Sequence, residues 1–275
     1  MPQNKDKPTK STSGFHLQGL IVTLALSVIP FYFIVYHWNF DNGSINDDKQ
    51  HVLKYFHDQF NALESIYPSQ SSHFWKRSRR ALELHLNRSE SNTQPAIILL
   101  TSARDAEQTL RCLSNKIAKI YSASRNMSYV FISGVNETFH DSDSAKLAID
   151  DILTSSFQGT SSAAVMHQLE QLHPGALLIL YKYCDHENAA FKNVAMVLTV
   201  LLDDLPHKPQ LQLNEIEEKV RDFLAAKFSI SNSERLHSEM DADKMGGVWS
   251  RISHLVLPVY PEDFLVECGS TEHGA

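Results

Sequence analysis

Apolar residues recur at helical spacing in seven stretches of the chain. In the first stretch, Val52, Phe56, Phe60 and Leu63 are three or four residues apart, which places them on one face of a helix. This spacing predicts helices over residues 51–66, 72–86, 105–122, 142–157, 161–172, 189–202 and 213–228.

Short apolar runs without helical spacing separate these helices and predict strands. The runs are Ala96–Thr101, Tyr129–Ser133, Ala176–Tyr183 and Ser253–Val259. Strands that are apolar throughout and alternate with amphipathic helices are typical of a parallel sheet covered on both faces. We therefore expect an α/β fold with a mainly parallel central sheet.

One apolar block stands apart, because residues 17–36 carry no formal charge. As a helix, twenty residues span about 30 Å, the thickness of the hydrocarbon core of a bilayer. The block ends in bulky aromatic residues rather than in the small residues of a signal-peptide cleavage site. We expect an uncleaved signal anchor that forms one transmembrane helix.

The charges that flank this block predict its orientation. Three lysines precede it and three aspartates follow it, which favours a cytoplasmic N-terminus. The expected organisation is a cytoplasmic tail over 1–16, the span over 17–36, a linker over 37–50 and a luminal domain over 51–275. Four N-glycosylation sequons follow the span, which supports a luminal location, and they begin at Asn42, Asn87, Asn126 and Asn136.

The composition excludes several kinds of partner and site. A chain of 275 residues with 43% hydrophobic residues forms one large domain with an appendage. The net charge of -7 leaves no surplus of Lys and Arg to neutralise a phosphate backbone, so we expect no nucleic-acid partner. Three cysteines without CxxC spacing form neither a disulfide scaffold nor a zinc site. From the residues alone, three buried thiols and all three single pairings stay open.

The loop after the first predicted strand is where a nucleotide-binding fold places its phosphate loop. Here it reads Ser102-Ala-Arg-Asp-Ala-Glu107, without glycine or lysine and with two acidic residues. Such a loop repels phosphates, so a nucleotide-type fold in this chain has lost its nucleotide. The end of the predicted strand at Asp185 resembles a Walker-B strand.

Two further segments carry residues of catalytic or metal-binding type. Asp141-Ser-Asp143 and Asp241-Ala-Asp243 match the DxD pattern of glycosyltransferases, although Asp141 could equally cap the helix that follows. The neighbouring residues Cys184 to Glu187 include four possible metal ligands, but adjacent side chains diverge in direction, so we expect no metal there.

Five segments together resemble the luminal domain of the torsin-interacting protein family. They are Leu99-Leu-Thr-Ser-Ala-Arg-Asp-Ala-Glu107, Leu110-Arg-Cys-Leu113, Tyr181-Lys-Tyr-Cys-Asp-His-Glu-Asn-Ala-Ala-Phe191, Glu217-Glu-Lys-Val-Arg-Asp-Phe-Leu224 and Trp249-Ser-Arg-Ile-Ser-His-Leu-Val-Leu-Pro258. The resemblance covers about residues 50–268. It implies a degenerate AAA+ fold that binds no nucleotide and no other cofactor. The implied partner is a torsin, a luminal AAA+ ATPase, in its ATP-bound form and in a mixed ring.

The resemblance also implies roles for particular residues. Arg251 would be an arginine finger that acts in the partner's site, and Glu217, Glu218 and Trp249 would contact the partner. Cys112 and Cys268 would form a disulfide and leave Cys184 as a buried thiol. The alternative interpretations are a surface ion pair for Arg251 and a solvated helix face for the two glutamates.

For the whole molecule the resemblance implies an ATPase activator rather than an enzyme, located in the endoplasmic reticulum membrane or the nuclear envelope. Only sixteen residues precede the expected span, so we expect no lamin binding. Two other functions are considered: a type II glycosyltransferase that uses a DxD motif, and a membrane tether that binds a partner without changing its turnover.

Overall fold

The computed structural model describes residues 48–88, 94–136, 142–203, 205, 212–229 and 240–263. Two compact units are distinguished, residues 1–50 and residues 51–275. The expected tail and the expected span over 17–36 lie outside the described residues. Among the helices that are described, none has both the length and the apolar character needed to cross a bilayer.

Five parallel strands form the central sheet in the order β2-β3-β4-β1-β5. The strands are β1 (Ala96–Ala103), β2 (Ser128–Ser133), β3 (Ser161–His167), β4 (Ala195–Leu202) and β5 (Val256–Pro258). β1 pairs along its whole length with β4, from Ala96 opposite Ala195 to Ala103 opposite Leu202. The predicted α/β fold with a parallel sheet is confirmed.

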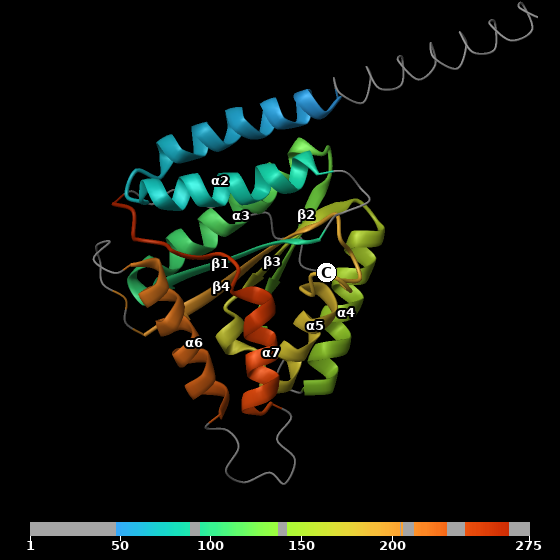
Figure 1. Cartoon of the computed structure of the whole chain (residues 1–275), viewed down its shortest axis with the longest axis vertical. Helices are drawn as coiled ribbons and strands as arrows, with labels where there is room; N and C mark the ends of the chain where they lie inside the picture. The colour runs from blue at the N-terminus through green and yellow to red at the C-terminus, as the bar shows by residue number, and fades with distance from the viewer. Residues whose placement is uncertain are drawn as a thin grey trace, which may run out of the picture. The chain divides into compact units, whose positions relative to one another are not determined.

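Helices cover both faces of the sheet (Figure 1). One face carries the helix that ends at residue 66, α2 (Ser72–Asn87) and α3 (Glu107–Ser124). The other face carries α4 (Ser142–Gln158), the 3-10 helix η5 (Pro174–Ile179), α5 (Leu180–Tyr183), α6 (Leu213–Ser229) and α7 (Ala242–Ile252). Two further 3-10 turns, η2 (Arg104–Ala106) and η4 (Leu169–Gln171), follow β1 and β3.

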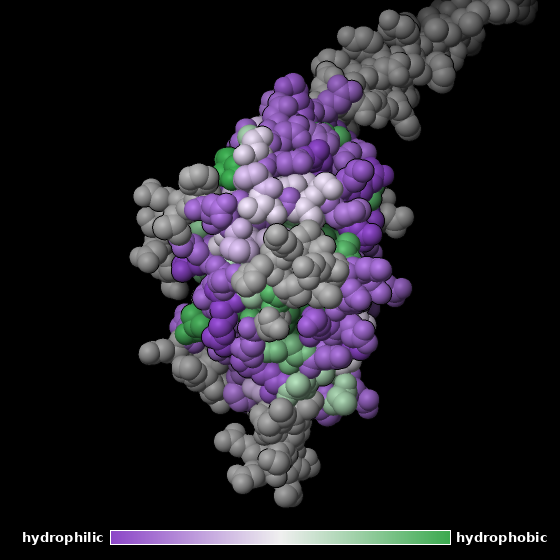
Figure 2. Space-filling model, turned by 90° about the vertical axis from the view of Figure 1, so that its left-hand side faces the viewer, coloured by the Kyte–Doolittle hydropathy of each residue, from purple (hydrophilic) through white to green (hydrophobic). Residues whose placement is uncertain are grey.

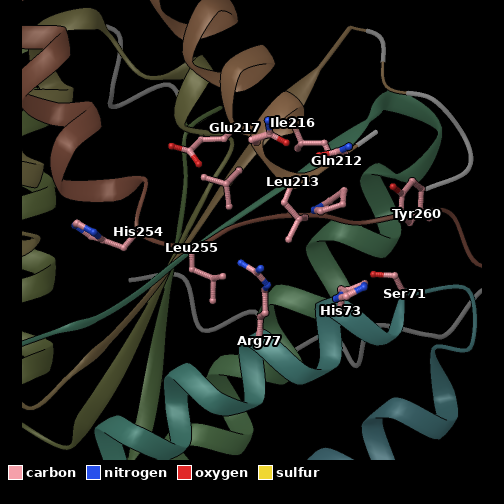
Figure 3. A pocket seen from close by; sticks show the side chains of 13 residues that line it. Ser71, His73, Arg77, Gln212, Leu213, Ile216, Glu217, His254, Leu255 and Tyr260 are labelled. Carbon is pink, nitrogen blue, oxygen red and sulfur yellow. The ribbon is translucent and has the colours of Figure 1, made fainter. Parts of the chain in front are cut away.

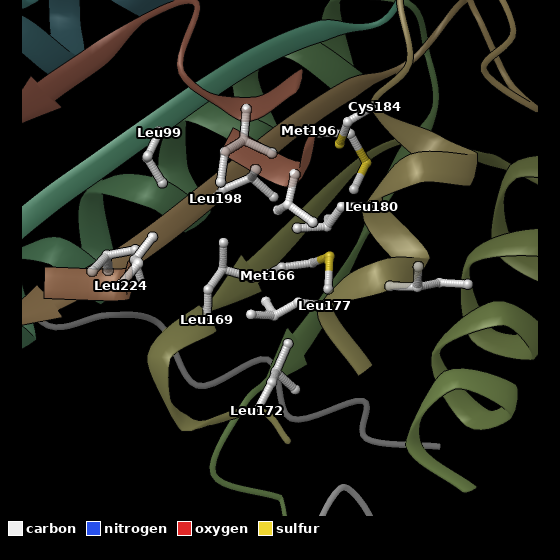
Figure 4. Close-up of a cluster of buried hydrophobic side chains, with 14 of the residues drawn as sticks. Leu99, Met166, Leu169, Leu172, Leu177, Leu180, Cys184, Met196, Leu198 and Leu224 are labelled. Atoms are coloured by element: carbon white, nitrogen blue, oxygen red, sulfur yellow. The ribbon is translucent and has the colours of Figure 1, made fainter. Parts of the chain in front are cut away.

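Alternate residues of each central strand serve the two faces, because side chains along a strand point to opposite sides. In β1, Ile98 and Leu100 pack with α2 and α3, whereas Ile97 and Leu99 pack with α6 and α7. Figure 4 shows the second cluster, in which leucine and methionine side chains from β1, β3 and β4 meet those of η5 and α5. One cluster of buried side chains thus lies on each face of the sheet and packs the sheet against the helices that cover that face.

Two predicted helices are wrong, because residues 161–167 form β3 and residues 195–202 form β4. Every residue of both strands is buried. A strand buried on both faces has no alternation of polar and apolar residues, so periodicity does not separate it from a buried helix.

The predicted strand over residues 176–183 is also wrong. Pro174 begins η5 and His173 caps it by accepting a hydrogen bond from the Gly175 amide at 3.3 Å. The apolar run continues as α5, whose Leu180 packs onto the sheet. Asp185 therefore follows a helix, and the Walker-B interpretation of this segment fails.

α7 is a helix that the pattern analysis did not predict, since Gly246 and Gly247 interrupt the segment. Asp241 caps it through its side chain, which accepts a hydrogen bond from the Lys244 amide at 2.7 Å. Met245, Val248 and Ile252 form its buried face. The predicted strand over 253–259 is shortened accordingly to β5.

Candidate functional site

Side chains of the loop after β1 contact the segments that follow β3 and β4. Arg104 lies in η2 and its Nη2 is 2.7 Å from Asp203 Oδ1, just beyond the end of β4. Glu107 begins α3, and its Oε1 accepts a hydrogen bond from Gln168 Nε2 at 3.0 Å. The first turn of α3, where a phosphate would bind, therefore carries a carboxylate instead.

Glu170 adds a further carboxyl group near this end of the sheet. Its side chain is 2% exposed, and its Oε2 accepts a hydrogen bond from the Leu201 amide at 3.1 Å. Burial raises the pKa of Glu170 to about 7, because the charged form loses its hydration. Glu170 is therefore only partly ionised at neutral pH, and the carboxylate that disfavours a triphosphate at this end of the sheet is that of Glu107.

Arg251 lies in the last turn of α7, and its guanidinium group is held on two sides. Nε donates a hydrogen bond to Asp185 Oδ2 at 2.9 Å, and Nη2 lies 2.8 Å from the same oxygen. Nη1 donates to the Gly247 carbonyl at 2.9 Å. The side chain is 25% exposed, so it is docked yet accessible from solvent.

The ring of Tyr181, in α5, packs against this guanidinium. Its ring centroid lies 4.2 Å from Arg251 Cζ, within the range of a cation–π contact. The phenol donates a hydrogen bond to the Lys244 carbonyl at 3.0 Å. A side chain at Gly247 would collide with this ring, since an added Cβ would lie 1.8 Å from the Tyr181 hydroxyl.

Asp185 is itself fixed by the turn that it begins. Its Oδ1 accepts hydrogen bonds from the amides of Glu187 at 3.0 Å and Asn188 at 2.8 Å. These bonds, the one from Asn188 foremost, together with Arg251 lower the pKa of the Asp185 carboxyl, so it is ionised at neutral pH. Next to it, the rings of His186 and His254 are 4.0 Å apart, which ties the same turn to the segment after α7.

The three residues expected to contact a partner lie in one groove between α6 and α7. Glu217, Glu218 and Trp249 line it together with Asn214 and Arg221, and its volume is about 250 Å³. Both glutamates are exposed, and Arg221 Nη2 lies 3.4 Å from Glu218 Oε1. Figure 2 views the α6 side of the molecule, where hydrophilic residues surround a strip of apolar surface. Trp249 is half-buried against the core cluster on this face of the sheet, and it offers an aromatic ring beside the charged residues of the groove.

A larger cavity of about 600 Å³ continues from α6 toward α2. Figure 3 shows Arg77 of α2 reaching into it, between Leu213 on one side and Leu255 on the other. Glu217 lines both this cavity and the groove. The expected contact residues thus belong to one surface that is continuous along α6.

The cysteines and sequons are only partly described. Cys112 is buried on α3, Cys184 is a buried free thiol after α5, and Cys268 lies outside the described residues, so the pairing stays a prediction. Asn87, Asn126 and Asn136 are exposed, whereas Asn42 lies outside the described residues. Their glycosylation stays a prediction.

The described part of the DxD pairs has a structural role. Asp241 caps α7, and Asp143 at the start of α4 pairs with Lys146 at 2.8 Å, while Asp141 lies outside the described residues. In the part of the chain that the structure describes, no group of three or more His, Cys, Asp and Glu side chains could hold a metal ion.

The sequence pattern does not predict Tyr181, Asp185 or Gly247 as site residues, although all three surround Arg251. Asp185 was considered only as a possible metal ligand or Walker-B residue, and α7 was not predicted. The usable signal was the Asp241 cap followed by apolar residues at helical spacing, which would have placed Gly247 and Arg251 one turn apart.

Comparison with known proteins gives consistent matches. A family model described as lamina-associated polypeptide 1, AAA+ activator domain, matches residues 38–271. Torsin-1A-interacting protein 1 of Homo sapiens is 52% identical over 214 residues, which is 78% of this chain and 37% of that protein. The protein of the same name from Mus musculus is 46% identical over 249 residues, 90% of this chain and 40% of that protein.

Torsin-1A-interacting protein 1 of Bos taurus is 52% identical over 214 residues, 78% of this chain and 36% of that protein. The chain therefore spans between 36% and 40% of the length of these three relatives. The family match covers all of the described residues, including α5, α6 and α7. This chain belongs to the torsin-interacting protein family and carries its AAA+ activator domain.

Proposed function

We propose that this chain binds a torsin AAA+ ATPase through the α6–α7 surface and activates ATP hydrolysis by that partner. The relatives are named for their interaction with torsin-1A, and the matching domain is described as an AAA+ activator. The observation that carries the proposal is the guanidinium of Arg251, held in place on α7 and still 25% exposed.

Arg251 would act as an arginine finger. A guanidinium delivered across an interface neutralises the charge that develops on the γ-phosphate during hydrolysis, and in GTPases this is worth about 10³- to 10⁵-fold in rate. The anionic loop after β1 makes this domain a poor host for a nucleotide of its own. Only the partner's site would then contain ATP.

The remaining parts of the proposal concern the assembly. The chain would bind the ATP-bound partner in a mixed ring, with Glu217, Glu218 and Trp249 at the interface. The apolar block over residues 17–36 would anchor it as a type II protein in the endoplasmic reticulum membrane or nuclear envelope, with residues 51–275 in the lumen.

The test is the ATPase rate of purified torsin-1A with increasing amounts of the full chain. We expect Arg251→Ala to change the affinity for torsin-1A by less than about threefold and to remove most of the stimulation, because the lost interaction forms in the transition state. Arg251→Lys should rescue little, since an ammonium lacks the forked donor geometry.

Glu217→Ala is the contrasting variant. A residue that contacts the partner in both the ground state and the transition state should lose binding and stimulation together. Wild-type stimulation by Arg251→Ala at saturation would contradict the finger assignment. Binding of torsin-1A without any stimulation by the wild type would favour the membrane tether.

A further inference from the structure

The contacts of Arg251 identify residues whose part in the proposed reaction goes beyond the finger itself. Arginine has five N–H donors. Two of them form hydrogen bonds, to Asp185 and to the Gly247 carbonyl. A third donor belongs to Nη2, which forms an ion pair with Asp185 at 2.8 Å. At least two donors, one on each terminal nitrogen, have no partner among the described residues.

These contacts hold the guanidinium group in one orientation and leave some of its N–H donors available to a ligand. A carboxylate on the Nε side sets the plane of the guanidinium, and the Tyr181 ring, 4.2 Å away, lies against it. One donor remains on each terminal nitrogen, and two such donors suit two oxygens of a phosphoryl group. An unrestrained arginine has several rotatable bonds and loses much more conformational entropy when it is ordered.

The support of Asp185 is unusually complete for a side chain so near the surface. Its other oxygen accepts two backbone amides, and the turn that supplies them is tied to the end of α7 by the His186–His254 ring contact. The sequence of α7 fits the position of Tyr181, because a residue with a Cβ atom at position 247 would collide with the Tyr181 ring where it now lies. Three separate elements therefore converge on one guanidinium.

We propose that Asp185 and Tyr181 are positioning residues that hold Arg251 in the orientation in which its free terminal donors meet the γ-phosphate in the partner's site. The proposal rests on the function proposed above. In this role Asp185 acts only through Arg251 and makes no contact with ATP.

The test uses Asp185→Asn in the purified full chain, with torsin-1A and ATP as the probe. The amide has only one accepting oxygen, so its NH2 group faces either the donors of Arg251 or the backbone amides of the turn, and the charge that holds the guanidinium is lost. We expect the affinity for torsin-1A to stay within about threefold of wild type, while the maximal stimulated rate falls at least about tenfold, as misplacement of a reacting group does. Asp185→Glu, which keeps the charge but moves the carboxylate by one methylene, should lower the maximal rate in the same direction.

The matched control is Asp203→Asn, which also removes a carboxylate from an Asp–Arg pair, at 2.7 Å from Arg104. It should leave the maximal rate unchanged. A double variant separates positioning from a general structural effect: Arg251→Ala with Asp185→Asn should be no worse than Arg251→Ala alone, because Asp185 has nothing left to position.

Wild-type or higher stimulation by Asp185→Asn or Asp185→Glu at saturation would overturn the inference, as would losses that multiply in the double variant. The outcome is distinguishable from failure of the proposed function. In that case Arg251→Ala itself would stimulate like the wild type, whereas failure of this inference alone leaves Arg251→Ala inactive and Asp185→Asn active.

Discussion

Glu170 shows how one buried carboxyl group makes the stability of this domain depend on pH. Its ordinary pKa of 4.5 is raised to about 7 by burial, and its Oε1 has no hydrogen-bond partner among the described residues. The fold therefore favours the protonated form. Ionisation costs stability progressively as the pH rises from about 4.5 to about 7, at about 1.4 kcal/mol per pKa unit.

Glu170→Gln removes this cost, because an amide of the same shape does not ionise and its oxygen still accepts from the Leu201 amide. We expect the variant to exceed the wild type in free energy of unfolding by about 1–3 kcal/mol at pH 8 and by less than about 1 kcal/mol at pH 5. Urea unfolding at the two pH values measures this difference. The exposed Glu187→Gln serves as control, and equal stability of Glu170→Gln and wild type at pH 8 would contradict the assignment.

At the scale of elements, the two adjacent glycines of α7 have opposite environments. A Cβ at Gly247 would lie 1.8 Å from the hydroxyl and 2.8 Å from Cζ of Tyr181, whereas a Cβ at Gly246 would meet nothing within 4 Å. Gly247 is therefore required for the packing of α5 against α7. Gly246 only weakens the helix.

Alanine at each position tests this difference. Gly247→Ala should lower the free energy of unfolding by about 1–3 kcal/mol through overpacking against Tyr181. Gly246→Ala should raise it by about 1 kcal/mol through helix propensity. Urea unfolding of the pair gives the comparison, and a higher free energy of unfolding in both variants would show that helix propensity rather than packing dominates.

The helices that the sequence predicted correctly are those with one polar face, and the strands β1 and β2 were predicted within two residues of their observed ends. The spacing of apolar residues placed α2, α3, α4 and α6 within about two residues of their ends, as periodic helices allow. β3 and β4, buried on both faces, carry no periodic signal, so they were mistaken for helices. The candidate site divides in the same way, because Arg251 was assigned from a resemblance, whereas its partner Asp185 is 66 residues away in sequence and their contact depends on the fold.

At the scale of the whole molecule, the expected Cys112–Cys268 bridge would join α3 to the segment after β5. The loop that it closes contains β2, β3, β4 and β5, so most of the sheet lies inside it. For loops of more than a hundred residues the chain-entropy model gives a stabilisation on the order of 5 kcal/mol, chiefly by restricting the unfolded chain. Reduction should therefore affect the stability of the entire domain rather than one end of it.

We expect peptide mapping without reduction to recover Cys112 linked to Cys268 and Cys184 as a free thiol, which agrees with its burial. Reduction, or Cys268→Ser, should lower the melting temperature by roughly 10–20 °C, the shift that about 5 kcal/mol produces in a domain of this size. Cys184→Ser is the control, and reductant should lower its melting temperature by the same amount as it does for the wild type. Alkylation of all three cysteines in the unreduced, unfolded chain would show that the bridge does not form, and the tail after β5 would then have to be held by the Gln70 and Glu262 hydrogen bonds that link it to the turn before α2.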